Sequence, residues 1–348
     1  MRLILFLVLF SLLSGHVSGQ GSFLKKLNSH PDSSYIASYK NDLVVRLYTS
    51  RKYMGQQLID GSLNKKLDYL PSNNYLVGFG INYKLLGINA GFSLPSMRMP
   101  VEKYGKTTFL DFQTHLYLRR VTFDLFSHVF WGQYLNNSHD ILKSPPPKGF
   151  YYTRPDIRAY AVNAEMNYNF NYSRFSFRAP FLQDEWQKKS AGSFFAGGGV
   201  YWDGSDADSS FVPSGIAVPD FYNGINFKRW EWLAVAATGG YAHTFVIDKR
   251  FFIMLSAIGG IGVGRSTLTD MDNRDYHTYS PFYKLTERFG AGYQFGRVYV
   301  GATCVNMDML MGAPPEGTRI HYRSGNIRAN VAYRFSLKKE IRIFPGRK

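Results

Sequence analysis

The sequence predicts an all-β fold, a transmembrane antiparallel up-and-down β-barrel. The first observation is the stretch 75–84, where apolar residues alternate with polar residues or glycine, so that a strand would have one apolar face. The second is that such segments recur, about ten residues at a time, along nearly the whole chain. The third is an aromatic content of 17%, which suits rings placed at two membrane interfaces.

The two ends of the chain are expected to lie outside the barrel. Residues 1–19, with Arg2 followed by an apolar run and small residues, have the layout of a secretory signal peptide. A polar segment over 20–41 would follow in the periplasm, then the barrel over 42–336 and a basic tail over 337–348. No apolar run of about 18 residues follows the signal, so no helical membrane span is expected.

The expected strands follow the alternation in chain order. Twelve crossings are predicted, with ten to fourteen as the range, because an even number puts every tight turn at the periplasmic end and every long connection outside. The last strand is expected to close the barrel on the first one. The expected strands are 42–50, 75–84, 86–93, 105–118, 121–131, 157–170, 174–201 with an irregular insertion at 183–192, 232–245, 249–264, 282–295, 297–308 and 319–335.

Residues on the polar face of these strands are the candidate lumen residues. Basic side chains outnumber acidic ones there, so a water-filled lumen would favour anions, whereas a sealed lumen would hold the same groups in ion pairs. The sequence leaves both alternatives open. The candidate lumen-facing residues are Arg46, Lys84, Asp111, His115, Asp124, His128, Glu165, Arg174, Arg178, Arg288, Arg328 and Arg334.

One group of these residues has the composition of a reactive site. Asp111, His115, Asp124 and His128 share inward parity on two adjacent strands, and such a cluster could do acid/base work or bind a metal. Carboxylates and histidines also fill narrow barrels in ordinary ion-pair networks, and this interpretation is favoured. Ser127 is adjacent to His128 and therefore points to the opposite face. We expect no catalytic residue, no metal and no cofactor.

The net charge and the cysteine content restrict the kinds of partner and of cross-link that we expect. The formal net charge is +16, or +15 once Arg2 leaves with the signal, without a helix-borne basic cluster or zinc-finger spacing. The expected partners are outer-membrane lipids and lipopolysaccharide, small anionic solutes and other envelope proteins, and not nucleic acid. Cys304 is the only cysteine, so no intramolecular disulfide can form.

Three blocks of residues carry a resemblance to a known family. They are residues 32–36 with 47–48 and 51–53, residues 186–193, and residues 326, 328 and 333–335. In these blocks the chain resembles a family of uncharacterised outer-membrane β-barrel proteins of Bacteroidetes, defined as a domain of unknown function. The resemblance implies the fold and the location and brings no activity with it. The tail beyond Phe335 departs from barrels that end at a terminal aromatic residue.

The sequence thus predicts a protein of the cell outer membrane that is exported by a cleaved signal peptide. We expect a passive pore, selective for anions, or a structural or accessory component of the envelope, and not an enzyme. One alternative is an enzyme that modifies lipid or lipopolysaccharide, with Asp111, His115, Asp124 and His128 as its site. The other is a subunit of a larger envelope complex, held through long loops or the N-terminal segment.

Overall fold

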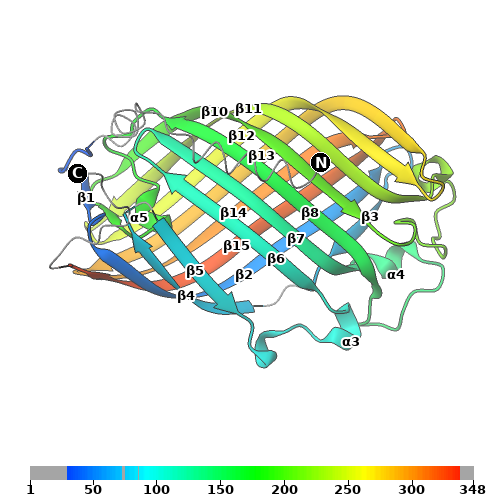
Figure 1. The fold of residues 1–348 in the computed structure, drawn as a ribbon, viewed down its shortest axis with the longest axis horizontal. Helices are drawn as coiled ribbons and strands as arrows, with labels where there is room; N and C mark the ends of the chain where they lie inside the picture. The colour runs from blue at the N-terminus through cyan, green and yellow to red at the C-terminus, as the bar shows by residue number, and fades with distance from the viewer. Residues whose placement is uncertain (1–29, 73–74, 85, 338–348) are drawn as a thin grey trace, which may run out of the picture.

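A computed structural model describes residues 30–72, 75–84 and 86–337, so the expected signal peptide and nearly all of the tail lie outside the described residues. Long antiparallel strands wrap around one axis (Figure 1). The strands are β1 (Ile36–Ser38), β2 (Leu43–Asp60), β3 (Lys65–Leu70), β4 (Tyr75–Tyr83), β5 (Leu86–Phe92), β6 (Thr108–Tyr117), β7 (Val121–Leu135), β8 (Tyr152–Asn169), β9 (Glu185–Gln187), β10 (Ala191–Asp206), β11 (Phe227–Ile247), β12 (Phe251–Asp270), β13 (Asp275–Phe295), β14 (Val298–Ala313) and β15 (Thr318–Phe335). The helices are η1 (Pro95–Met97), α3 (Val101–Tyr104), α4 (Ser138–Ile141), α5 (Arg178–Phe181) and η2 (Phe221–Gly224). Within the described ranges, no helix has the length and apolar character to cross a membrane.

Ten strands close a ring. The last long strand, β15, pairs with β2 along its length, from Thr318 opposite Asp60 to Phe335 opposite Leu43. The ring runs through β2, β3, β7, β8 and β10 to β15, and back to β2. The predicted antiparallel barrel and its closure on the first strand are confirmed. The number of strands in the ring is at the lower end of the predicted range.

Three further strands lie between β2 and β7, off the ring. There β3 bridges to β7 through only two residues, with Tyr69 opposite Leu135 and Leu70 opposite Tyr134. Beside it, β4 pairs with β2 and with β5, while β6 pairs with β7. A path through β2, β4, β5, β6, β7, β8 and β10 to β15 contains the twelve predicted strands, but in the described part of the chain no pairing joins β5 to β6.

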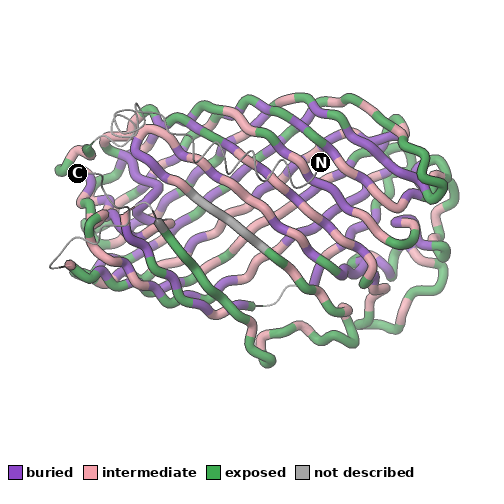
Figure 2. Tube along the Cα trace, in the orientation of Figure 1, coloured by how far each residue is buried: buried purple, intermediate pink, exposed green. Residues whose placement is uncertain are grey.

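Buried and more exposed residues alternate along much of the long strands (Figure 2). On β13, the exposed Tyr283, Leu285 and Phe289 alternate with the buried Lys284 and Arg288. This order follows from the two-residue period of a strand, which sends neighbouring side chains to opposite faces. On β13, the apolar residues that the alternation predicts as outward are therefore the exposed ones.

The strands extend further than their alternation indicates. Only a short turn between β12 and β13 remains of the gap between the expected strands 249–264 and 282–295, and β10 continues for five residues, up to Asp206, beyond the expected strand end at residue 201. Beyond the apolar belt the pattern reverses, since the outward Glu231 on β11 is polar while its inward neighbours Trp230 and Trp232 are aromatic. The apolar-outward pattern that marks a membrane strand in the sequence is therefore inverted there.

Candidate functional site

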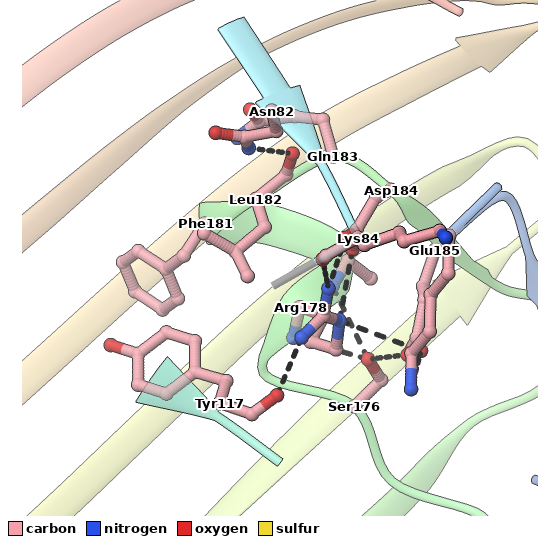
Figure 3. Close-up of polar contacts among 12 residues, drawn as sticks. Asn82, Lys84, Tyr117, Ser176, Arg178, Phe181, Leu182, Gln183, Asp184 and Glu185 are labelled. Atoms are coloured by element: carbon pink, nitrogen blue, oxygen red, sulfur yellow. Dashed lines mark hydrogen bonds and ion pairs between the residues drawn. The ribbon is translucent and has the colours of Figure 1, made fainter. Parts of the chain in front are cut away.

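Residues 175–187 leave the wall and fold into the barrel interior, where they pack with β1 (Figure 3). We call residues 175–187 together with β1 the plug. The rings of Phe175 and Phe177 are 1% and 4% exposed and lie 5.8 and 4.9 Å from the ring of Phe195 on β10. After α5 the chain forms β9, which pairs with β1. The plug thus closes the end of the lumen where the chain enters the barrel.

The prediction that residues 174–181 begin a wall strand with outward phenylalanines was wrong. Phe175 and Phe177 face the interior, and the wall strand β10 begins only at Ala191. One signal in the sequence could have excluded the strand, since Pro180 cannot donate a ladder hydrogen bond in the middle of a sheet. In the structure, Gln183 also adopts a left-handed conformation, with φ of 58°.

Two arginines of the wall bind the same residue of the plug. Arg46 on β2 donates from Nη1 to Oε1 of Gln183 at 2.9 Å and to the carbonyl of Phe181 at 3.2 Å. Arg334 on β15 donates from Nε to the carbonyl of Gln183 at 2.6 Å and from Nη1 to Gln294 at 2.7 Å. Both arginine side chains are buried. Their charges therefore serve to hold the plug and do not face an open lumen.

Arg178 of α5 binds the wall from the plug side (Figure 3). Its Nη1 donates to the carbonyl of Tyr117 at 2.6 Å, and its Nη2 donates to the carbonyl of Lys84 at 3.0 Å. The same guanidinium pairs with Asp184, with Nε 3.1 Å from Oδ1. One buried cation thus joins the ends of β4 and β6 to the plug.

Glu185 is the acidic centre of the plug. Its carboxylate pairs with Arg119 and accepts a hydrogen bond from the hydroxyl of Ser176. The ammonium of Lys40 lies 3.9 Å from Oε1 of Glu185. Burial, followed by the positive charge of Arg178, lowers the pKa of Lys40 from its ordinary 10.5 to about 8. The cluster therefore contains a lysine whose charge changes within an accessible pH range.

Ion pairs continue into the middle of the lumen. Arg288 on β13 donates from Nη2 to Oδ2 of Asp124 on β7 at 2.6 Å. Lys284 on β13 pairs with Glu165 on β8, which also accepts from the hydroxyl of Tyr201 at 2.8 Å. Because opposite walls supply the two members of each pair, these side chains cross the lumen and fill it.

Aromatic side chains fill the other half of the barrel. Trp230 donates from Nε1 to Oε1 of Gln56 at 2.7 Å, and Trp232 donates from Nε1 to Oδ2 of Asp203 at 2.7 Å. Tyr322 lies 6.2 Å from the Trp230 ring, measured between centroids. These rings are fully buried. Their polar atoms have partners, as buried indole groups require.

One small cavity lies between the plug and the wall. It has a volume of about 10 Å³, and its lining includes Tyr117, Arg119, Asn169, Phe175 and Glu185. This volume is about that of one water molecule. It is far below the several hundred Å³ of an ordinary small-molecule site.

The candidate lumen residues have different positions. Those buried in the interior are Arg46, Asp124, His128, Glu165, Arg178, Arg288 and Arg334. Arg178 belongs to the plug and not to a wall strand. Arg328 is half-buried on β15, with its guanidinium 4.6 Å from the ring centre of Tyr48. Lys84 lies in the turn between β4 and β5.

Arg174 was expected in the lumen and is on the outside. Its side chain is 54% exposed, with Nε 3.7 Å from Oδ2 of Asp32 and the guanidinium 5.0 Å from the ring centre of Tyr35. The reason is that residue 174 lies in the turn that precedes the plug. Its inward parity was deduced for a strand that is not there.

The proposed reactive group is brought together only in part. Asp111 and His115 pair in register with His128 and Asp124, but their side chains lie outside the described part of the structure. Asp124 is bound by Arg288, and Nε2 of His128 lies 2.7 Å from the hydroxyl of Tyr322. Among the described residues, no three histidine, cysteine or acidic side chains form a metal-binding group.

Comparison with known proteins gives a family and distant structural likenesses. No curated protein matches the sequence. The outer-membrane protease OmpT of Escherichia coli is 9% identical, over 86% of this chain and 98% of that chain, with a TM-score of 0.37. The translocator domain of the autotransporter NalP from Neisseria meningitidis is 11% identical, over 91% of this chain and 94% of that chain, with a TM-score of 0.34.

The toluene transporter TodX of Pseudomonas putida is 8% identical over 89% of this chain and 95% of that chain, with a TM-score of 0.25. Because these TM-scores are below 0.5, the likenesses support no conclusion about what this chain does. The family model, by contrast, matches residues 30–335, which include the plug and every strand of the ring. The chain therefore belongs to the family described as domain of unknown function DUF4421.

Proposed function

We propose that the protein is a sealed barrel that works as a non-conducting structural or accessory component of the outer membrane, within a larger envelope assembly. The observation that carries the proposal is the interlocked plug. Arg46 and Arg334 of the wall and Arg178 of the plug use their donors on acceptors across the plug boundary. A lumen closed in this way leaves the outer surface, the loops and the plug face as the places where the protein can act.

The outer surface supports the location in the outer membrane. Exposed apolar residues follow the outward face of the strands, and the outward positions near the strand ends on the plug side include Tyr293, Phe295, Tyr333 and Phe335. An apolar band flanked by aromatic rings is typical of barrels in this membrane. Contact with lipid and lipopolysaccharide, and export by a signal at 1–19, belong to the same proposal.

Conductance of single molecules in planar bilayers tests the seal. The protein folded from residues 20–348 is expected to give no steady current. A variant in which a short Gly-Ser linker replaces residues 175–187 is also expected to stay closed, because the ion pairs of Asp124 and Glu165 and the rings of Trp230 and Trp232 still fill the rest of the lumen. Heat-modifiable migration in gels, which is a mark of folded barrels, checks that both proteins are folded.

Steady current through the intact protein would overturn the sealed barrel and favour a pore for small anionic solutes. Co-purification from membranes in mild detergent tests the assembly, with an envelope protein of fixed stoichiometry as the expected result. Recovery of the barrel alone at every detergent concentration would contradict the accessory role.

We also propose that the protein is not an enzyme. The support is that Asp124 is already bound by Arg288 and that His128 meets the hydroxyl of Tyr322. His115→Ala and His128→Ala are expected to leave the lipid and lipopolysaccharide composition of the envelope unchanged. A changed lipid profile in folded variants would favour the enzyme instead.

A further inference from the structure

The outer surface carries a charged residue in the middle of an apolar row. On β13 the exposed outward positions include Tyr283, Leu285, Phe289 and Tyr293, and Glu287 lies among them with its side chain exposed. A carboxylate is unfavourable at a position that faces lipid chains, because lipid offers it neither water nor a hydrogen-bond donor. A membrane protein that keeps such a residue usually gives it a protein partner.

A hydrogen-bonded network extends from Glu287 across two neighbouring strands. Asn306 on β14 donates to Oε2 of Glu287 at 3.1 Å and also binds Asp308. Tyr53 on β2 reaches across β15 and donates to Oδ1 of Asn306 at 3.0 Å. It passes over Gly325, where a Cβ atom would lie only 2.3 Å from the tyrosine ring. Glycine at this position therefore permits the network.

Basic residues lie on the same outer surface, on β15 and β2. Nε2 of His321 on β15 is 3.0 Å from Oδ1 of Asp308, and Nη2 of Arg323 is 3.5 Å from Oδ1 of Asp68 on β3. Arg51 on β2 shares outward parity with the exposed Leu47. We call the surface formed by Glu287, Asn306, Asp308, Tyr53, His321, Arg323 and Arg51 the polar outer face.

We propose that the polar outer face is the interface through which a second copy of this chain docks within the membrane. A two-fold interface uses the same surface on both subunits, so that surface must be complementary to itself. The polar outer face has this property, because its acid Glu287 is at the β13 margin and its base Arg51 is at the β2 margin. A two-fold axis along the membrane normal exchanges the two margins and brings Glu287 of one copy toward Arg51 of the other.

The proposal rests on the membrane placement given above, but not on the sealed lumen. A dimer can conduct ions, and a monomer can be non-conducting. The conductance test can therefore contradict the sealed lumen without contradicting the dimer, and the cross-linking test can contradict the dimer without contradicting the sealed lumen.

Cys304 provides a probe at the edge of this face, two residues from Asn306. It is the only cysteine of the chain, it lies on β14 with the same parity as Asn306, and its cross-strand neighbours are Phe289 and Ile327. The folded protein in phosphatidylethanolamine and phosphatidylglycerol vesicles is treated with a short bismaleimide. The expected product is a cross-linked dimer, at least fivefold above the Cys304→Ser, Val235→Cys variant, whose cysteine faces lipid on β11.

Charge reversal separates docking from folding. Glu287→Arg alone is expected to reduce the Cys304 cross-link at least fivefold, because it places two arginines against each other across the interface. Glu287→Arg combined with Arg51→Glu is expected to restore it. Heat-modifiable migration shows which variants are folded, and the double variant keeps the test decisive if one single variant does not fold.

Three results would overturn the proposal. The first is a cross-link no stronger than that of the Val235→Cys control. The second is a cross-link that charge reversal in a folded variant leaves unchanged. The third is a cross-link in native envelopes from Cys304 to a cysteine of a protein of another mass, which would assign the face to that partner.

Discussion

Arg46 on the first wall strand binds Gln183 inside the barrel, with Nη1 2.9 Å from Oε1, although the two residues are 137 positions apart in the chain. The carbonyl of the same glutamine accepts from Arg334 on the last wall strand. The two strands that close the barrel against each other are thus also joined through the plug. Closure of the wall and seating of the plug are coupled.

Arg46→Met is expected to lower the free energy of unfolding by about 2 kcal/mol, the usual range for losing hydrogen bonds to a buried charged group. Gln183 and the carbonyl of Phe181 would lose a donor at a buried site. Urea unfolding in lipid vesicles measures the change. The matched control is the exposed Arg174→Met, for which a change below about 0.5 kcal/mol is expected. Equal effects of both substitutions would contradict the coupling.

The wall could be predicted from the sequence because each position is decided locally. Ile327 and Val331 are exposed, while Arg334 is buried, as their parity on β15 indicates. The strand ends beyond the apolar belt could not be predicted, since the outward Glu231 there is polar while the inward Trp230 and Trp232 are aromatic, which reverses the pattern of the belt. The pairing of β2 with both β3 and β4 also has no local signal in the sequence. It depends on which part of the edge of β2 is left unpaired by the other strands of the sheet.

The plug could not be predicted from alternation. Phe175 and Phe177 alternate with polar residues as they would in a wall strand, and only Pro180 contradicts that interpretation. Whether Asp124 and His128 serve chemistry or packing depends on residues from distant strands. Arg288 and Tyr322 determine that environment, and no spacing in the sequence relates them to β7.

Lys40 is expected to make stability depend on pH. Its pKa is about 8 in the folded protein, because burial disfavours the ammonium, and about 10.5 when unfolded. Between these values the unfolded state binds more protons, so the contribution of Lys40 to stability rises with pH. Below pH 8 the Lys40 ammonium is charged in both states, and its burial destabilises the folded protein by the full amount. Lys40→Met is therefore expected to gain most over the unsubstituted protein near pH 7, with the gain shrinking toward pH 10.

Urea midpoints at pH 7, 8, 9 and 10 measure this dependence, and Lys103→Met, at an exposed site on α3, is the control. For the control, a difference from the unsubstituted protein that is constant over this range is expected. Parallel pH curves for Lys40→Met and the unsubstituted protein would show that Lys40 keeps its ordinary pKa.

Gly292→Ala is expected to disturb the packing beside the plug. A Cβ atom at this inward position of β13 would lie 2.5 Å from the ring of Tyr299, a fully buried residue that packs against Phe252. Overpacking of this kind costs about 1 to 3 kcal/mol. Gly215→Ala, where a Cβ meets nothing within 4 Å, is the control in the same urea assay. A loss for Gly292→Ala no larger than that of the control would mean that Tyr299 has room to move.

Substitutions of Asp124 and Arg288 test whether the ion pair between them serves only as packing in the lumen. Asp124→Leu alone leaves the Arg288 guanidinium buried without its 2.6 Å partner, and a loss of about 3 to 5 kcal/mol is expected. Asp124→Leu with Arg288→Met removes both charges, and most of that loss is expected to return, because an apolar pair of similar volume replaces an ion pair at little cost. A double variant as unstable as the sum of the single ones would show that each charge has other essential partners. Recovery of stability with an unchanged envelope lipid profile would instead identify the pair as packing in a sealed lumen.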